Sequence, residues 1–237
     1  MNTPCIILAG GLGTRLRSAV PDLPKCLAPI AGRPFLEWQL RSLAERGVNH
    51  FVLALGHGAD QVLESLARPW ARSLSISTVI ERELLGTGGS AYYAMTATGL
   101  DEALIANGDT FLGGSLQAML APLDFSIGEE MRIATVQVTN RARFGGVNVD
   151  SAQRVVAFRE KGKSDSGPIN AGLYRIRRSA LDSEDESVFS METQVMPRLV
   201  LKGALQAREL AGPFIDIGVP EDYHHFSERV HDYVSKI

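Results

Sequence analysis

The segment that most constrains the fold is Gly10-Gly11-Leu12-Gly13-Thr14-Arg15, which directly follows the short apolar run 5–8. Such a pattern is typical of a strand that ends in a loop, and ligands of open α/β sheets bind at this end of the strands. Glycines let backbone N–H groups approach phosphate oxygens closely, and Arg15 adds a planar, permanently charged guanidinium. The segment therefore predicts an anion-binding loop suited to a triphosphate, unless the glycines only allow a tight turn and Arg15 is solvated. The nearby Lys25, which follows Pro24, favours the anion-binding loop.

Short apolar runs alternate with amphipathic stretches through the first half of the chain. This alternation predicts a mostly parallel sheet with helices on its faces. The second half is richer in strand-like runs and is expected to extend the same sheet. The predicted fold class is α/β, a Rossmann-like mixed, mainly parallel sheet flanked by helices. We expect strands at 5–8, 50–55, 75–80, 103–106, 132–138, 146–149, 155–158 and 169–175, and helices at 34–46, 59–66, 90–96, near 192–201 and from 219 onward.

The charge and composition argue against several classes of partner. A net charge of -3 over 237 residues gives no electrostatic argument for binding nucleic acid or an anionic membrane. The apolar stretches are too short to cross a membrane, and the N-terminal run lacks the basic lead of a signal peptide. With only two cysteines, a disulfide framework is not expected. We expect one cytoplasmic domain spanning residues 1–237.

The glycine segment differs from two widespread phosphate-binding motifs. It lacks the G-x-G-x-x-G spacing of nicotinamide dehydrogenases and the Gly-Lys-Ser/Thr ending of the common ATPase loop. Together with Pro24-Lys25, it resembles the signature of the sugar-1-phosphate nucleotidyltransferases, in which GGxGTRL is followed by Pro-Lys-Pro-Leu. Further markers of that family follow in order over nearly the whole chain: Leu85-Gly86-Thr87-Gly88-Gly89, Asn107-Gly108-Asp109, Phe144-Gly145-Gly146-Val147, Phe158-Arg159-Glu160-Lys161, Asn170-Ala171-Gly172 and Ile215-Asp216-Ile217-Gly218.

This resemblance implies a fold of the nucleotide-diphospho-sugar transferase type, with a nucleotide-binding part at about 1–110 and a sugar-phosphate-binding part at about 111–237. It also implies a Mg²⁺-dependent reaction of a nucleoside triphosphate with a sugar 1-phosphate that releases pyrophosphate. The stretches LGTGGS, FGGVNVD and FIDIGVPEDYHHF are similar to the short subgroup that transfers GMP from GTP to D-glycero-α-D-manno-heptose 1-phosphate.

Several alternatives stay open at this point. Within the family, the chain could be a uridylyl- or thymidylyltransferase that acts on a hexose or N-acetylmuramic acid 1-phosphate. A non-catalytic nucleotide-sugar sensor is the alternative from another class, although the candidate catalytic residues are all present. The protein is expected to be a monomer or a small homo-oligomer.

One group of residues is assigned by resemblance to the nucleotide and to catalysis. Arg15, Lys25 and Asp109 are the expected catalytic residues. In the expected base-binding loop 81–88, the carboxylate of Glu81 suits the adjacent N1–H and amino donors of guanine better than uracil or thymine. This favours GTP, with backbone groups near Gly86 as the alternative selector of the base. The expected nucleotide-binding set is Leu8, Ala9, Gly10, Gly11, Gly13, Thr14, Arg15, Glu81, Gly86, Thr87, Asn107 and Gly108.

Two acids are the expected metal ligands. Asp109 follows the apolar run 103–106 and should lie at the carboxyl edge of the sheet, while Asp216 belongs to a distant strand-like run. Mg²⁺ binds through one or two carboxylates together with substrate phosphates and retains several waters. The pair therefore predicts a single Mg²⁺ site at the α-phosphate.

The sugar phosphate is expected to bind residues of the second half. By resemblance, Lys161 neutralises its phosphate, with Glu160 beside it. Asn170 would bond the sugar hydroxyls, and Gly172 and Gly145 would leave room for the ring.

One residue departs from the family pattern. Cys26 stands where a proline is expected after Lys25, so this segment should be less rigid. A nucleophilic thiol of low pKa beside Lys25 is conceivable. The expected reaction, however, needs no covalent intermediate.

Overall fold

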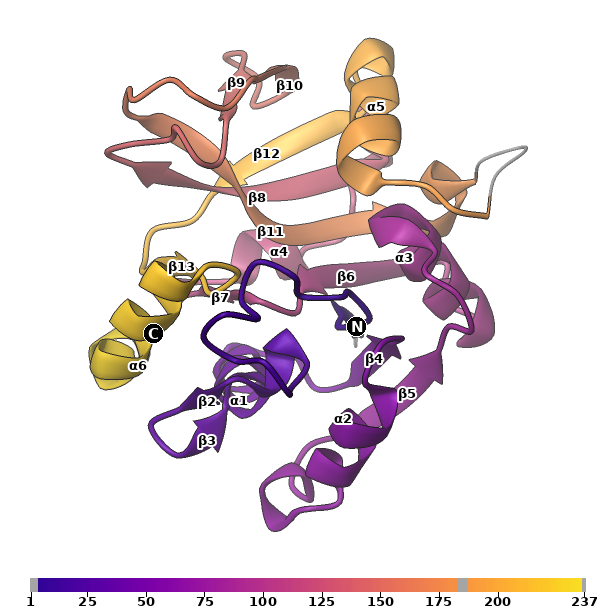
Figure 1. Cartoon of the computed structure of the whole chain (residues 1–237). Helices are drawn as coiled ribbons and strands as arrows, with labels where there is room; N and C mark the ends of the chain where they lie inside the picture. The colour runs from indigo at the N-terminus through magenta and orange to yellow at the C-terminus, as the bar shows by residue number, and fades with distance from the viewer. Residues whose placement is uncertain (1–3, 183–186, 236–237) are drawn as a thin grey trace.

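The structure is a computed structural model that describes residues 4–182 and 187–235. Within these residues, a seven-stranded sheet has the strand order β12-β8-β11-β6-β1-β4-β5 (Figure 1). Strand β11 runs antiparallel to β6 and β8, and the other neighbours are parallel. The predicted mixed, mainly parallel sheet is confirmed. Its strands are β12 Leu205–Glu209, β8 Met131–Val138, β11 Gly167–Arg177, β6 Glu102–Asn107, β1 Cys5–Leu8, β4 Phe51–Leu55 and β5 Ile76–Ile80.

Shorter strands pair two by two outside this sheet. They are β2 Pro29–Ile30 with β3 Arg33–Pro34, β7 Thr110–Leu112 with β13 Phe214–Asp216, and β9 Gly146–Val149 with β10 Val155–Arg159. The helices are α1 Phe35–Glu45, α2 Ala59–Leu66, α3 Gly86–Ala97, α4 Gln117–Leu120, α5 Met196–Lys202 and α6 Pro220–Val234, with a 3₁₀ turn η1 at Lys25–Leu27 and a π-helical turn η5 at Met191–Val195.

Helices cover both faces of the main sheet. Successive residues of a strand point to opposite faces, so a buried strand contributes apolar side chains to both. Ile7 of β1 belongs to a core cluster with Leu40 of α1. Its neighbour Ile6 belongs to a second cluster with Ala91 of α3 and Leu199 of α5. Both isoleucines are fully buried. The central strand therefore lies in the interior, and only its carboxyl end is available to a ligand.

Two predicted helix starts are wrong. Helix α1 begins at Phe35, because Pro34 has an extended backbone and caps the helix instead of starting it. Helix α3 begins at Gly86 rather than at residue 90. The glycines of its first turn allow a close contact, since a Cβ on Gly88 would lie 2.4 Å from the ring of Phe189. The expected base-binding loop therefore ends in the first turn of a helix.

The second half extends the sheet only in part. Strands β8, β11 and β12 join it, whereas β9 and β10 form a separate hairpin. Before β9 the chain turns at Gly145, whose φ of 76° is a left-handed conformation that glycine adopts readily. Among residues 4–182 and 187–235, none of the helices has both the length and the apolar character that a membrane crossing requires.

A third core cluster fixes the C-terminal helix against β7 and β13 (Figure 1). Phe226 of α6 is fully buried, and its ring centroid lies 5.1 Å from that of Phe111 and 5.7 Å from that of Phe35. The hydroxyl of Tyr223 donates to the carbonyl of Pro29 at 2.8 Å. Helix α6 therefore holds β13, and with it Asp216, against the rest of the domain.

We expect Phe226→Ala to lower the free energy of unfolding by about 3–5 kcal/mol, because it leaves a cavity in this cluster. Urea unfolding followed by circular dichroism measures the change. Glu228→Ala, at an exposed position of the same helix, should change the same quantity by no more than about 0.5 kcal/mol. Equal losses in the two variants would contradict the described packing of α6.

Candidate active site

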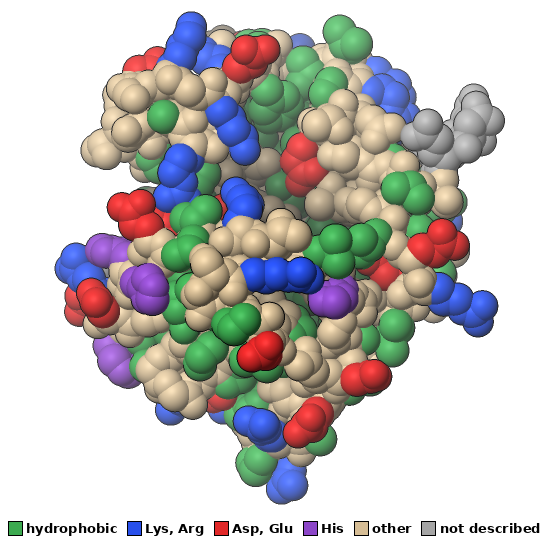
Figure 2. Space-filling view, in the orientation of Figure 1, with side chains coloured by type: hydrophobic (Ala, Val, Ile, Leu, Met, Phe, Trp, Pro, Cys, Tyr) green, Lys and Arg blue, Asp and Glu red, His purple; other side chains and the backbone are tan. Residues whose placement is uncertain are grey.

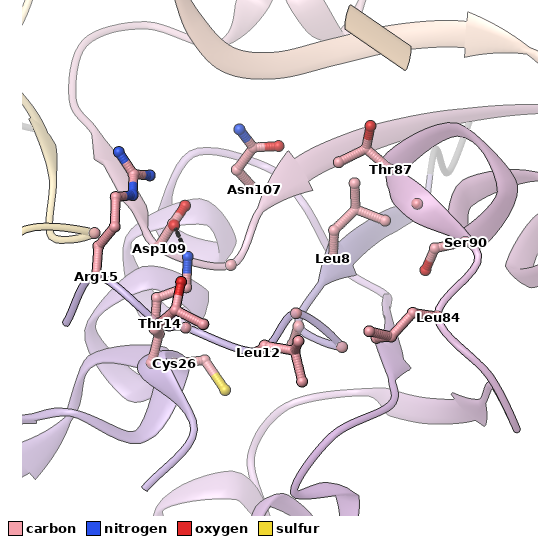
Figure 3. Close-up of a pocket in the computed structure, with 18 of the residues that line it drawn as sticks. Leu8, Leu12, Thr14, Arg15, Cys26, Leu84, Thr87, Ser90, Asn107 and Asp109 are labelled. Carbon is pink, nitrogen blue, oxygen red and sulfur yellow. Dashed lines mark hydrogen bonds and ion pairs between the residues drawn. The ribbon is translucent and has the colours of Figure 1, made fainter. Parts of the chain in front are cut away.

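A cavity of about 500 Å³ opens at the carboxyl ends of β1 and β6 (Figure 3). These strands pair in parallel with Leu8 opposite Asn107, so the loops that follow them meet. Every residue predicted to bind the nucleotide lies on its wall. The lining residues are Leu8, Ala9, Gly10, Gly11, Leu12, Gly13, Thr14, Arg15, Lys25, Cys26, Glu81, Leu84, Gly86, Thr87, Ser90, Asn107, Gly108, Asp109 and Gly218.

The glycine loop packs closely on Lys25. Gly13 has a φ of 63°, and a Cβ there would lie 2.6 Å from Cγ of Lys25. The missing side chain therefore lets the lysine stem lie against the loop. Leu16 is buried and anchors the end of the loop, beside Arg15 on the cavity wall. On the face shown in Figure 2, Lys and Arg side chains gather around a hollow between the upper and lower parts of the molecule.

Carboxylates meet these cations at one end of the cavity. Lys25 forms an ion pair with Asp109. Gly218 marks the point where the other groups converge: a Cβ on it would lie 2.8 Å from Oδ1 of Asp216, 3.3 Å from Nη2 of Arg15 and 3.4 Å from Oδ2 of Asp109. Burial raises the pKa of Asp216, and the charge of Asp109 raises it further. Asp109 and Asp216 thus come from different parts of the chain and lie close enough to influence one another.

The donor set at this point fits Mg²⁺. Within residues 4–182 and 187–235, no group of three His, Cys, Asp or Glu side chains could hold a metal ion. Mg²⁺ is commonly bound through one or two carboxylates while substrate phosphates and waters complete its octahedron, and the two acids here fit that pattern.

The opposite end of the cavity contains an unpaired carboxylate oxygen. Oε1 of Glu81 lies against two glycines: a Cβ would be 2.5 Å from it on Gly10 and 2.8 Å from it on Gly56. Oε2 is buried and has no hydrogen-bond partner. Burial raises the pKa of this side chain. Leu12 and Leu84, each 44% exposed, supply apolar surface to the same cavity (Figure 3). Hydrogen bonds from Ser90 and the backbone of Leu85 partly offset the effect of burial on the pKa of Glu81. This end of the cavity therefore combines a carboxylate with apolar surface.

The hydroxyl of Thr87 is already committed within the protein. It donates to Oε2 of Glu192 at 2.6 Å and accepts from the backbone N–H of Met191 at 2.9 Å. Gly86 has a φ of 73°, and a Cβ on it would lie 2.5 Å from the carbonyl oxygen of Phe189. These two predicted nucleotide-binding residues therefore hold the start of α3 against the π-helical turn η5. Glu192 was not among the residues predicted from the sequence. The serine two residues earlier is the only local feature that could have indicated it.

The predicted sugar-phosphate residues are less closely grouped. Asn170 donates from Nδ2 to the hydroxyl of Tyr174 at 3.0 Å and accepts from the N–H of Gly172 at 3.0 Å. A Cβ on Gly172 would lie 2.9 Å from Nδ2 of Asn107, so the space expected for a sugar is taken by that amide. Gly172 nevertheless adjoins Asn107, which lines the cavity, and Asn170 contacts Gly172.

The remaining sugar-phosphate residues lie outside the cavity wall. Gly145 has a left-handed φ of 76°, and a Cβ on it would strike the carbonyl oxygen of Arg159 at 2.5 Å. Glycine is thus needed here for a backbone turn, and the assignment of Gly145 to the sugar phosphate stays a prediction. Glu160 and Lys161 are exposed in the segment after β10 and do not line the cavity. Their assignment to the sugar phosphate stays a prediction.

A nucleophilic role for Cys26 is not supported. The thiol is 2% exposed, and burial raises its pKa to about 12. A thiol is a nucleophile only as a thiolate, which this environment disfavours. Cys26 and Leu27 are instead the buried residues of the turn η1 that carries Lys25.

Comparison with known proteins identifies the family. Residues 5–233 match the nucleotidyl transferase family. The chain belongs to this family. Two D-glycero-alpha-D-manno-heptose 1-phosphate guanylyltransferases are similar over nearly the full length of both chains. The relative from Aneurinibacillus thermoaerophilus is 34% identical, covering 97% of this chain and 99% of its own. The relative from Campylobacter jejuni subsp. jejuni is 36% identical, covering 93% and 97%.

A solved structure is also similar to this nucleotidyl transferase. The crystal structure of HddC from Yersinia pseudotuberculosis complexed with GMP-PN has a TM-score of 0.85 and 32% identity, over 96% of this chain and 99% of that chain. The family predicted from the motifs is therefore confirmed.

Some residues of the cavity wall were not among the predicted site residues. Leu12 and Gly218 lie inside motifs that carry the resemblance, so their position in the motif could have identified them. Ser90 lies one turn into α3 and beyond the predicted loop 81–88. It was not predicted because the helix was expected to begin at residue 90. Leu84 lies in the expected base-binding loop 81–88, but nothing in the sequence distinguished it from its neighbours in that loop.

The two thiols of this nucleotidyl transferase should resist labelling. Cys5 and Cys26 are both buried, with pKa values raised to about 12. We expect dithionitrobenzoate at about pH 8 to label the native protein at least 100-fold more slowly than the urea-unfolded protein. The unfolded chain should release one thiolate equivalent per cysteine. Rapid labelling of the native protein would contradict the burial of the turn that carries Lys25.

Proposed function

We propose that this protein transfers GMP from GTP to a sugar 1-phosphate, most specifically D-glycero-α-D-manno-heptose 1-phosphate, in the presence of Mg²⁺. The products are GDP-heptose and pyrophosphate. The observation that carries the proposal is the convergence of Arg15, Lys25, Asp109 and Asp216 at one end of the cavity. Cations and paired acids together suit a polyphosphate with its metal, whereas cations alone would suit any anion.

The reaction asks the protein for positioning and charge neutralisation. An oxygen of the sugar 1-phosphate forms a bond to the α-phosphorus of GTP. The bond from that phosphorus to the oxygen bridging to the β-phosphorus breaks on the opposite side, and the electron pair leaves with pyrophosphate. The attacking phosphate is already ionised, so no general base is required. Arg15 and Lys25 lie where they can hold the triphosphate in line and offset its growing negative charge.

Asp109 and Asp216 are the proposed ligands of Mg²⁺. Bound there, the ion would withdraw charge from the phosphate oxygens. Lys25 would exchange its contact with Asp109 for one with phosphate. Lys161 is proposed to bind the phosphate of the sugar, which requires the exposed segment after β10 to approach the cavity.

Guanine is proposed as the base because of Glu81. Its carboxylate borders the cavity and would accept hydrogen bonds from the adjacent N1–H and amino group of guanine. Uracil and thymine present carbonyl oxygens around their single N–H and would leave a carboxylate poorly paired. Two relatives that bear a guanylyltransferase name and share 34% and 36% identity support the same choice, and their names supply the heptose.

Pyrophosphate release tests the proposal. The protein is incubated with Mg²⁺, one of GTP, UTP, dTTP, CTP or ATP, and a panel of sugar 1-phosphates that includes D-glycero-α-D-manno-heptose 1-phosphate. We expect release with GTP and the heptose phosphate. Release with UTP or dTTP instead would keep the reaction and reject the guanine assignment. Tight nucleotide binding with no release on any sugar phosphate would point to a sensor.

Loss of one proposed metal ligand should abolish turnover without unfolding the chain. We expect Asp109→Asn to lower kcat by at least about 1000-fold, because it removes a carboxylate from the α-phosphate site. Asp124→Asn is a matched control on the surface, where the acid only caps a short turn. Circular dichroism should show both variants folded. Near-normal turnover in Asp109→Asn would mean that the metal assignment is wrong.

The affinity for GTP should depend on pH through Glu81. Burial raises the pKa of this acid in the free protein, so the proton binds before the pH reaches the usual carboxyl range. Guanine donors require the ionised form, and the KM for GTP should therefore rise as the pH falls from neutral toward about 5. Glu81→Gln should raise the KM at neutral pH by about 10-fold or more and flatten this dependence. An unchanged KM in Glu81→Gln would exclude the carboxylate as the base selector.

A further inference from the structure

A buried glutamine of helix α1 contacts the turn that carries Asp109. Gln39 is 3% exposed, and its Nε2 donates to the main-chain carbonyls of Asn107 and Thr110, each at 2.7 Å. These two carbonyls lie on either side of Asp109 in sequence. One amide group therefore ties both ends of the turn between β6 and β7 to the helix.

Other backbone contacts hold the same turn from different sides. The N–H of Gly108 donates to the carbonyl of Leu8 at 3.0 Å, and the N–H of Ile217 donates to the carbonyl of Asp109 at 2.9 Å. The last residue of β1 and the residue that follows β13 thus fix the turn at its middle. Only Gln39 reaches it with a side chain among the hydrogen bonds of the described residues to these backbone groups.

Gln39 is a polar side chain in a buried position, where a hydrophobic residue would be more usual. Its Oε1 is buried without a hydrogen-bond partner. The residue borders a second cavity of about 10 Å³, lined also by Ser42, Thr110 and Gly172. That volume is close to what one water molecule requires. Burial of a polar amide costs free energy unless its N–H groups make hydrogen bonds. Both N–H groups of Gln39 donate to carbonyls of the Asp109 turn.

We infer that Gln39 is a positioning residue for Asp109. By fixing the carbonyls before and after this acid, it holds the carboxylate at the point where it meets Asp216 and Arg15. The inference rests on the proposed function, because it assigns Asp109 to the metal and the α-phosphate. Displacement of a reacting group by about 1 Å is enough to lower a rate by about 100-fold.

The test replaces the two donors while the side-chain length is kept. In Gln39→Met, kcat for pyrophosphate release from GTP should fall by about 100-fold, and the KM for GTP should change by less than about threefold. A second readout does not depend on turnover: binding of Mn²⁺ alone, followed by the electron paramagnetic resonance of the free ion, should weaken by about 10-fold or more.

Gln206 offers a matched control. It is 1% exposed in β12, and its amide, turned to face them, donates to the main-chain carbonyls of Ala152 and Gln153 at 3.2 Å each. Gln206→Met therefore removes the same kind of buried amide from the edge of the sheet. We expect a comparable loss of thermal stability in the two variants, with kcat and Mn²⁺ binding changed only by Gln39→Met.

Gln39→Asn keeps the test decisive if the methionine variant does not fold. The shorter amide can reach at most one of the two carbonyls, so kcat and Mn²⁺ affinity should fall to intermediate values. Unchanged Mn²⁺ affinity in a folded Gln39 variant, or an equal fall in Gln206→Met, would overturn the inference. If the wild type releases no pyrophosphate from GTP, the proposed function fails, and the Mn²⁺ measurement still decides the role of Gln39.

Discussion

The parallel pairing of β1 with β6 is the constraint on which the rest of the site depends. Its register sets Leu8 opposite Asn107, so both strands end at the same level. The glycine loop that follows β1 and the turn that follows β6 then face one another. The N–H of Gly108 donates to the carbonyl of Leu8, and a Cβ on Gly108 would lie 2.6 Å from that oxygen. A shift of this register would separate the cations of the loop from the acid of the turn.

Much of the fold could be predicted from local patterns in the sequence. Buried parallel strands are short apolar runs, and the helices of the first half have clear apolar faces. Residues 59–66 therefore form the predicted helix, and the strand predicted at 50–55 is observed at 51–55. The boundary errors occur where tertiary contacts outweigh propensity. Glycines are poor helix formers, yet residues 86–89 form the first turn of α3. Larger side chains at the glycines of this turn would collide with segment 187–189. Strand β12 was not predicted, because its sequence LQARE lacks the regular alternation of apolar and polar residues that indicates an edge strand.

The grouping of the candidate site residues was predictable where a motif occupies contiguous residues. Arg15, Lys25 and Asp109 lie on one cavity wall, as expected from their motifs. The unpredicted features depend on residues brought together only by folding. Glu192 meets Thr87 from 105 residues further along the chain, and Gln39 meets the Asp109 turn from a helix that looks purely structural in sequence. The cavity walls do not include Lys161, whose place beside a ligand depends on an exposed segment that the described contacts leave on the surface.

The charges of Lys25 and Asp109 compensate each other through their ion pair. Each group supplies the counter-charge of the other, so an anion that approaches the glycine loop must compete with Asp109 for the lysine. Any cation that binds Asp109 releases Lys25 and raises the affinity of the loop for anions. Linkage is reciprocal, so an anion on Lys25 raises the affinity of Asp109 for cations by the same factor. Through this ion pair, a cation at Asp109 and an anion at Lys25 would each favour the binding of the other.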